Sequence, residues 1–279
     1  MLDILLDSVI DTLKSLPFLL GAYLLIECME HRASGKLTQA LGKLGPLGPV
    51  GGALLGCVPQ CGFSVAAANL YAGRLITPGT LLAVFLATSD EALPILLSRA
   101  GAGGEVLRLL GVKLAAAALA GILADFVAAR LPGGRQRQPF QDLCQDCGCE
   151  ERGIFLSALS HTLRVFLFLL GVNLALGLGM AWVGEERLSR LLLTGSVFQP
   201  LLAGLIGFIP NCAASVLLTE LYLSGSLSFG SAVAGLCTGA GLGLAVLFRV
   251  NQNLKENLCI AGALYAAAVA AGLACQAIA

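Results

Sequence analysis

The sequence predicts an all-α polytopic membrane protein, and two bulk observations carry that prediction. Apolar residues make up 57% of the 279 positions and charged residues only 12%, with a mean hydropathy of +0.86, whereas soluble domains carry about 25% charge. Several apolar segments also reach the length of about 20 residues that a helix needs to cross a bilayer. Both observations make the lipid bilayer the expected environment, and the net charge of zero argues against a nucleic-acid partner.

The apolar segments predict the helices in chain order: 8–29, 46–72, 78–98, 105–130, 153–182, 195–222, 231–249 and 257–278. The chain begins with MLDILLDSVIDTLK, which is acidic where a cleavable signal peptide is basic, so we expect the first helix to remain in the mature protein. The polar stretch 132–152 is predicted to separate a first transmembrane repeat, 1–131, from a second, 153–279.

Identical residues recur 151 positions apart, which indicates an internal duplication. The shared motif is Pro-x-Cys-x-x-Ser-Val, found in CVPQCGFSV and again in FIPNCAASV. Further identical pairs are Pro49 and Pro200, Gly56 and Gly207, Tyr71 and Tyr222, Gly79 and Gly230, Glu105 and Glu256, and Gly121 and Gly272. Internal repeats of this kind are typical of secondary transporters.

The motif prolines predict an interrupted helix in each repeat. Pro59 and Pro210 lie in the middle of apolar segments, where a proline removes a backbone donor and breaks the helix. Because freed backbone at membrane depth is tolerated where it is buried in protein or lines a cavity, we expect a re-entrant broken-helix hairpin; a simple proline kink is the alternative. Each repeat would have three crossing helices and one hairpin, about ten helical segments in all.

Loop charges predict the orientation of the repeats. If 46–72 and 195–222 are re-entrant, the second repeat is inverted and both chain ends lie outside. The cytoplasmic loops then hold most of the basic residues, as the positive-inside rule requires: Arg32, Lys36, Lys43, Arg74, Arg130, Arg135, Arg137, Arg152, Arg249 and Lys255, against Arg99, Arg108, Arg187 and Arg190 outside. A single crossing by 46–72 would make the repeats parallel and place the central loop outside, against that rule.

Asp90 and Glu91 are the strongest candidates for a site at membrane depth. They lie in ATSDEALP within 78–98, where the second repeat has Gly241 and Leu242. A carboxylate at that depth is costly and marks a functional site; the alternative is a salt bridge to Lys113 or Arg164. The rest of the predicted substrate site consists of Cys57, Cys61, Cys212, Ser64, Ser215, Gln60, Asn211 and Asn69. Thiolate together with carboxylate and carbonyl oxygen is typical of transition-metal sites, with Asp90, Glu91, Cys61 and Cys212 as metal ligands.

The central loop supplies a second candidate metal site. Cys144, Cys147 and Cys149 form Cys-x-x-Cys-x-Cys in CQDCGCEE, among acidic residues. This pattern favours a metal-binding loop, and the alternative is a redox-active or incidental cysteine cluster.

The doubled motif, TSDEALP and the Cys-rich loop together resemble the ten-transmembrane heavy-metal exporters, a family described as manganese transporters or arsenic efflux permeases. The most specific stretches are CVPQCGFS, ATSDEALPIL and IPNCAAS, and the resemblance covers nearly the whole chain. It implies export of a metal or metalloid across the bacterial inner membrane. The loop departs from the family in having no His, a residue in which that loop is often rich.

The sequence therefore predicts a secondary-active exporter of a divalent transition-metal ion, Mn-like or a heavier metal, which is not an enzyme and has no cofactor besides its substrate. Because no P-loop motif is present, the energy would come from a proton or ion gradient or from a partner subunit, and a homodimer is one open assembly. One alternative is a permease for an anionic or thiol-reactive metalloid such as an arsenical, favoured by helix N-termini after Pro59 and Pro210. The other is a membrane thiol oxidoreductase using Cys57, Cys61 and the loop cysteines.

Overall fold

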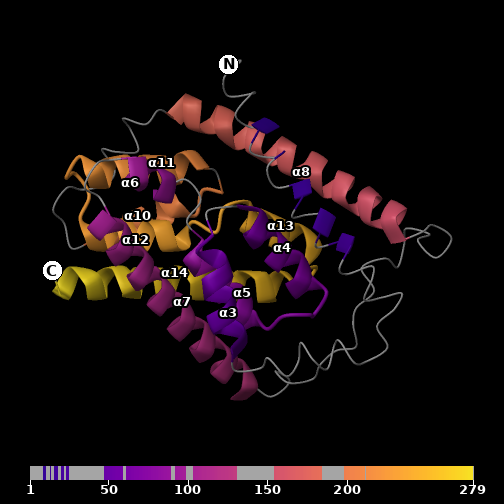
Figure 1. Ribbon diagram of the computed structural model, residues 1–279, viewed down its shortest axis with the longest axis horizontal. Coiled ribbons are helices and arrows are strands. Elements are labelled where there is room, and N and C mark those ends of the chain that lie inside the picture. Colours follow the sequence, from indigo (N-terminus) through magenta and orange to yellow (C-terminus); the bar gives the residue numbers. More distant parts are fainter. Residues whose placement is uncertain are drawn as a thin grey trace.

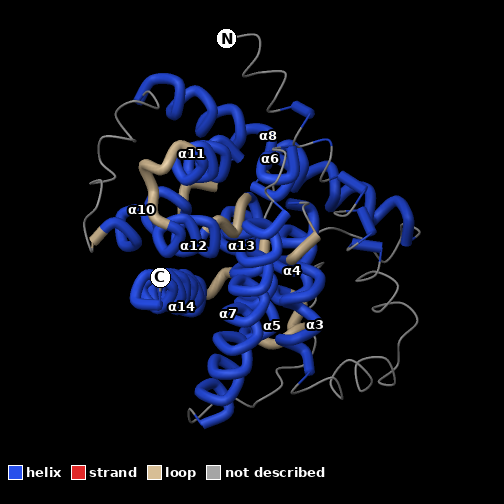
Figure 2. Tube along the Cα trace, turned by 60° about the vertical axis from the view of Figure 1, so that its left-hand side comes forward, coloured by secondary structure: helices blue, strands red, loops and turns tan. Residues whose placement is uncertain are grey.

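The computed structural model describes residues 47–58, 61–88, 92–98, 103–130, 154–183, 198–210 and 212–278, with isolated positions between 9 and 24. These residues are mostly helical and contain no strand. The all-α prediction is therefore confirmed for the described part of the chain (Figure 1, Figure 2). In both views α8 (Ile154–Val183) lies along one edge of the molecule and α7 (Gly103–Arg130) reaches the opposite edge.

The remaining helices form two sets with matching bounds. The first set is α3 (Gly48–Gly56), α4 (Cys61–Ala72), α5 (Pro78–Ala87), α6 (Ala92–Ser98) and the long helix α7. The second set is α10 (Gln199–Gly207), α11 (Cys212–Leu223), α12 (Phe229–Thr238), α13 (Leu242–Val250) and α14 (Leu254–Ile278). Apart from α6 and α13, each helix begins 151 positions from its counterpart. The duplication read from the sequence therefore extends to the helix boundaries.

Both Pro-x-Cys segments interrupt a helix, as the sequence predicts. In the first repeat α3 ends at Gly56 and α4 begins at Cys61. In the second repeat α10 ends at Gly207 and α11 begins at Cys212. Pro210 lies between α10 and α11, where its missing N–H cannot continue the helix, and Pro59 holds the same position in the sequence between α3 and α4.

Each repeat has a second interruption, which corrects two of the predicted helices. The segment 78–98 is not one helix but α5 and α6, because Thr88 leaves the helical region with ψ 130°. The segment 231–249 is likewise α12 and α13, joined through Gly241, whose φ of 54° is a left-handed value that glycine adopts freely. Asp90 and Glu91 fall in the interval between α5 and α6, outside the described residues.

Glycines allow the helices of each repeat to pack closely. α5 packs on α3 and α7, and α12 packs on α10 and α14 in the same way. Gly79 of α5 faces Gly121 of α7, and Gly230 of α12 faces Gly272 of α14; a Cβ at any of the four would collide with its partner's carbonyl oxygen. Small residues at such contacts let helix backbones approach each other, which is how helices associate in lipid.

The two repeats interlock by exchanging a helix. α13 of the second repeat packs on α4 of the first, and α6 of the first repeat packs on α11 of the second. Because each repeat gives the other the same element, the two halves meet through self-complementary surfaces, as subunits do in a two-fold dimer.

Three described segments are long and apolar enough to cross a membrane: Gly103–Arg130, Phe229–Val250 and Leu254–Ile278. The second of these consists of α12, its interruption and α13, and it is largely buried in the protein. α7 and α14 instead expose large apolar side chains such as Leu119, Leu123 and Leu258. Extended apolar surface of this kind marks contact with a membrane or another protein.

Candidate functional site

The two interruptions of each repeat lie side by side. In the first repeat, a Cβ on Gly56, at the end of α3, would lie 2.8 Å from the Cβ of Ala87, the last residue of α5. In the second repeat, a Cβ on Gly207 would collide with the hydroxyl of Thr238, the last residue of α12. That hydroxyl donates a hydrogen bond to the Gly204 carbonyl oxygen at 2.8 Å, which ties α12 to α10. Four helices thus end in two adjacent pairs.

Lys113 of α7 connects the interruptions of the two repeats. Its side chain is completely buried. Its ammonium donates a hydrogen bond to the carbonyl oxygen of Thr88, just after α5, and another of 2.7 Å to the carbonyl oxygen of Leu236, in the last turn of α12. Both acceptors stand at the C-terminal end of an interrupted helix, where the partial negative charge of the helix favours a cation.

The two predicted serines also lie at the interruptions. Ser64, in the first turn of α4, is buried against α13, since a Cβ on Gly243 would lie 2.7 Å from the Ser64 Cβ. Ser215, at the same position of α11, is half-buried, and its Oγ lies 3.5 Å from where a Cβ on Gly239 would stand. Gly239 follows the last residue of α12, so this hydroxyl is next to the second interruption.

Cys57 lies at the same centre, whereas Asn69 is held elsewhere by the fold. Cys57 is the residue that follows α3; its thiol is free and half-buried, within the electrostatic reach of the Lys113 ammonium. Asn69 lies two turns into α4, where its side-chain oxygen accepts a hydrogen bond from the Tyr23 hydroxyl at 2.8 Å and its amide donates to the Val65 carbonyl at 2.8 Å. These bonds give Asn69 a role in holding Tyr23 against α4.

The other predicted ligands cannot be placed in the same way. Those outside the described residues are Asp90, Glu91, Gln60, Asn211, Cys144, Cys147 and Cys149. Cys61 and Cys212 begin α4 and α11, and their side chains also lie outside the described part. Among the side chains that the structure does describe, no three His, Cys, Asp or Glu residues gather as a metal site. Both metal sites stay predictions.

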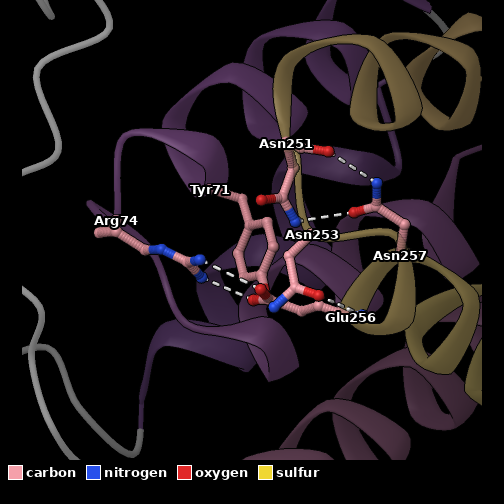
Figure 3. Close-up of polar contacts among 6 residues, drawn as sticks. All are labelled: Tyr71, Arg74, Asn251, Asn253, Glu256 and Asn257. Atoms are coloured by element: carbon pink, nitrogen blue, oxygen red, sulfur yellow. Dashed lines mark hydrogen bonds and ion pairs between the residues drawn. The ribbon is translucent and has the colours of Figure 1, made fainter.

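Two further contacts join the repeats away from the interruptions. The Tyr71 hydroxyl, at the end of α4, donates to the Glu256 carboxylate in the first turn of α14, and the Arg74 guanidinium donates to both oxygens of that carboxylate at 2.6 and 3.0 Å (Figure 3). The counterpart contact is a hydrogen bond from Tyr222, near the end of α11, to Glu105 in the first turn of α7. The same tyrosine and glutamate therefore pair twice, each time across the repeats.

Among the described residues, an ion pair accompanies the first of these contacts and not the second. Arg74 has the left-handed φ of 59°, and its counterpart Gly225 has a φ of 77°. Such a φ is uncommon for residues other than glycine, so the backbone conformation is unfavourable for an arginine at this position. The hydrogen bonds from its guanidinium to Glu256 raise the pKa of Arg74. Figure 3 shows that Asn251 and Asn257 bond to each other beside this cluster, at 2.7 Å.

Sequence reasoning did not assign Lys113 or the Tyr–Glu pairs to a site. Lys113 entered only as an alternative partner for the acidic pair, although a lysine within LLGVKLAAAALA is itself an expensive residue at membrane depth. Tyr71 and Glu256, with Tyr222 and Glu105, were visible as repeated residues. Their common offset identifies counterparts and says nothing about which residue bonds to which.

In the part of the chain that the structure describes, the fold and this centre define an all-helical protein of two interlocked repeats, with segments apolar enough to cross a membrane and interrupted helices joined by a buried lysine. Comparison of the chain with family models, with curated proteins and with solved structures gives no match. The resemblance to heavy-metal exporters stays a prediction.

Proposed function

We propose that the protein is a secondary-active membrane transporter whose substrate binds where the interrupted helices of the two repeats meet. The observation that carries this proposal is the pair of hydrogen bonds from Lys113 to Thr88 and Leu236, one in each repeat. A single polar centre is thereby built from both halves, inside otherwise apolar segments. Interrupted helices and repeat interfaces are where secondary transporters bind their substrates and coupling ions.

The Tyr–Glu contacts support the proposal that the repeats are inverted, with both chain ends outside the bacterial inner membrane. In the inverted arrangement, the end of α4 and the start of α14 face the cytoplasm, and the end of α11 and the start of α7 face outward. Tyr71 bonds to Glu256 and Tyr222 bonds to Glu105, so each contact joins two ends on one side. Parallel repeats would put the two partners of each contact on opposite faces of the membrane.

As the substrate we propose a divalent transition-metal ion that is exported from the cytoplasm. Cys61 and Cys212 begin the helices that follow the two Pro-x-Cys interruptions. Asp90 and Glu91 follow Thr88, whose carbonyl accepts the Lys113 hydrogen bond. The ammonium would balance one of the two carboxylates and leave the other, with the thiolates, for the metal. Such a mixed set of sulfur and oxygen ligands suits borderline transition metals.

A permease for an anionic or thiol-reactive metalloid is the second candidate, and a separate contact favours it. The first turns of α4 and α13 pack directly on each other through Ser64 and Gly243. Two helix N-termini in one place carry partial positive charge and exposed backbone N–H groups, which attract anions. The buried Lys113 ammonium adds a full positive charge to the same centre.

The test is flux into proteoliposomes loaded with a metal-sensitive dye, with Mn²⁺, Zn²⁺, Cd²⁺ and Fe²⁺ offered in turn. We expect uptake by the native protein and at least a tenfold loss in Asp90→Asn, because the neutral amide removes the charge that binds the ion; tenfold corresponds to about 1.4 kcal/mol. Lys255→Gln, which removes an exposed charge at the start of α14, is the matched control and should transport like the native protein.

Two outcomes would reject the metal proposal. Equal flux in the native protein and in Asp90→Asn would show that the Asp90 carboxylate does not bind the transported ion. No flux for any of the four cations, from folded protein under a pH gradient, would favour the metalloid permease, which is then tested with arsenite uptake in the same vesicles.

A further inference from the structure

We propose that the Lys113 ammonium fills a cation position that the two repeats would otherwise offer to a coupling ion, so that the protein works without Na⁺ or K⁺. The cation position rests on the geometry alone. The statement about coupling rests on the proposed transport function.

The interruption of α12 frees the carbonyl oxygen that Lys113 binds. In a continuous helix the Leu236 carbonyl would accept a hydrogen bond from the N–H of Ala240, four residues later. Here the Ala240 N–H bonds instead to the Thr238 carbonyl at 2.7 Å, so the Leu236 carbonyl is left to the Lys113 ammonium at 2.7 Å. The same interruption that removes the helical hydrogen bond of the Leu236 carbonyl therefore makes this oxygen available to Lys113.

The first repeat supplies the matching oxygen. Thr88 has left the helical region with ψ 130°, so its carbonyl no longer points along α5 as a helical carbonyl does. This oxygen is the second acceptor of the Lys113 ammonium. Carbonyl oxygens at interrupted helix C-termini are the groups with which transporters hold Na⁺. The two repeats thus present a pair of cation ligands, and the lysine occupies the place between them.

A packing role does not account for a charged side chain here. The counterpart of Lys113 in the second repeat is Leu264, which is also completely buried. Leucine therefore satisfies the same position on α14, whereas burying an ammonium carries a large desolvation penalty. Besides balancing a carboxylate of the proposed substrate site, the ammonium gives the carbonyl ends of α5 and α12 the cation that helix C-termini favour. A lysine provides one that is tethered and cannot dissociate during the cycle.

The experiment removes the tethered cation and asks whether a free one takes its place. Lys113→Ala and the matched control Leu264→Ala are purified, and their thermal unfolding is measured with propylammonium, Na⁺ or K⁺ chloride against choline chloride. Propylammonium replaces the atoms that the alanine variant lacks. Because a ligand that binds the folded state stabilises it, we expect the unfolding temperature of Lys113→Ala to rise by about 2 °C or more with propylammonium or Na⁺. Leu264→Ala should not respond.

An equal response of the two variants, or no response of Lys113→Ala to any of the three cations, overturns the inference. So does a native protein whose unfolding temperature depends on Na⁺ or K⁺ at constant ionic strength, a test that needs no variant to fold. In proteoliposomes, propylammonium should restore flux to Lys113→Ala. A stability response without flux in any form of the protein would uphold the cation position and reject the proposed transport function.

Discussion

At the scale of single residues, Arg74 shows how the duplicated halves have diverged. It occupies a left-handed turn position with φ 59°, which the second repeat fills with Gly225 at φ 77°. An arginine in this conformation costs about 1 kcal/mol or more relative to glycine. Its guanidinium instead bonds both oxygens of Glu256, next to the hydroxyl of Tyr71. Because the pair is partly exposed, its contribution to stability is modest, about 1 kcal/mol or less.

We expect Arg74→Ala to be less stable than Arg74→Gly by about 1 kcal/mol. Both variants lose the ion pair with Glu256, but only alanine keeps the unfavourable left-handed backbone, since glycine adopts it freely. Gly225→Ala is the matched variant in the second repeat and should lose a similar amount, because its Cβ meets no atom within 4 Å and only the backbone changes. Thermal unfolding in detergent measures all three. Equal stability of Arg74→Ala and Arg74→Gly would show that the turn relaxes at no cost.

At the scale of helices, the sequence predicted one kind of interruption and missed the other. Pro59 and Pro210 remove a backbone donor, a local effect that any sequence reveals. The ends of α5 and α12 carry no proline. They are defined by Thr88, by a left-handed Gly241 and by the bonds of Lys113 to freed carbonyls, which come from a distant helix. The sequence marks Lys113 as a costly residue in an apolar segment, but it does not show which carbonyl oxygens the ammonium binds, because those contacts are tertiary.

The glycine contacts between helices make a second prediction. Gly121→Ala should destabilise the protein by about 1–3 kcal/mol, because its Cβ would lie 2.6 Å from the Gly79 carbonyl oxygen and 2.7 Å from the Pro49 Cβ. Gly272→Ala should do the same between α14 and α12, where the nearest side chain is Ala234 at 2.7 Å. In both cases the obstacle is backbone or a short side chain that cannot move aside.

Two other glycines on the same helices are the controls. Gly111 of α7 and Gly262 of α14 are counterparts, and a Cβ at either meets nothing within 4 Å. Alanine there should be neutral or stabilising by up to about 1 kcal/mol, because it is the better helix former. If Gly121→Ala and Gly272→Ala were as stable as Gly111→Ala and Gly262→Ala in thermal unfolding, α5 and α7, and α12 and α14, could not pack as closely as described.

At the scale of the whole molecule, the exchanged contacts make the two repeats one unit. α13 packs on α4 and α6 on α11, and the Tyr71–Glu256 and Tyr222–Glu105 bonds each join the end of a short helix to the start of a long one in the other repeat. The sequence offset predicted the duplication, and the loop charges predicted the inversion. The interlocking was not predictable, because a repeat in sequence does not specify which surfaces of the two copies meet.

Inversion has a direct test in the accessibility of three exposed positions. Cysteines are introduced one at a time as Gly103→Cys at the first residue of α7, Ser224→Cys after α11 and Gln252→Cys before α14, and each is labelled in intact cells with a membrane-impermeant maleimide. If the repeats are inverted, positions 103 and 224 lie together on the outer face, since Glu105 and Tyr222 are hydrogen-bonded to each other, and position 252 lies on the cytoplasmic face beside Arg74 and Glu256. We therefore expect labelling at 103 and 224 in intact cells, and at 252 only after the membrane is permeabilised.

Parallel repeats give a different pattern, which makes the test decisive. With one crossing by each Pro-x-Cys segment, position 224 would still face outward, but 103 would join 252 on the cytoplasmic side and resist labelling until permeabilisation. The native protein, labelled in parallel, measures the background from its own cysteines, of which Cys259 is exposed. Position 103 thus separates the two arrangements. If position 103 were protected and position 224 labelled in intact cells, Glu105 and Tyr222 would lie on opposite faces of the membrane. The hydrogen bond between them would then be wrong, because two side chains cannot bond across a bilayer about 30 Å thick.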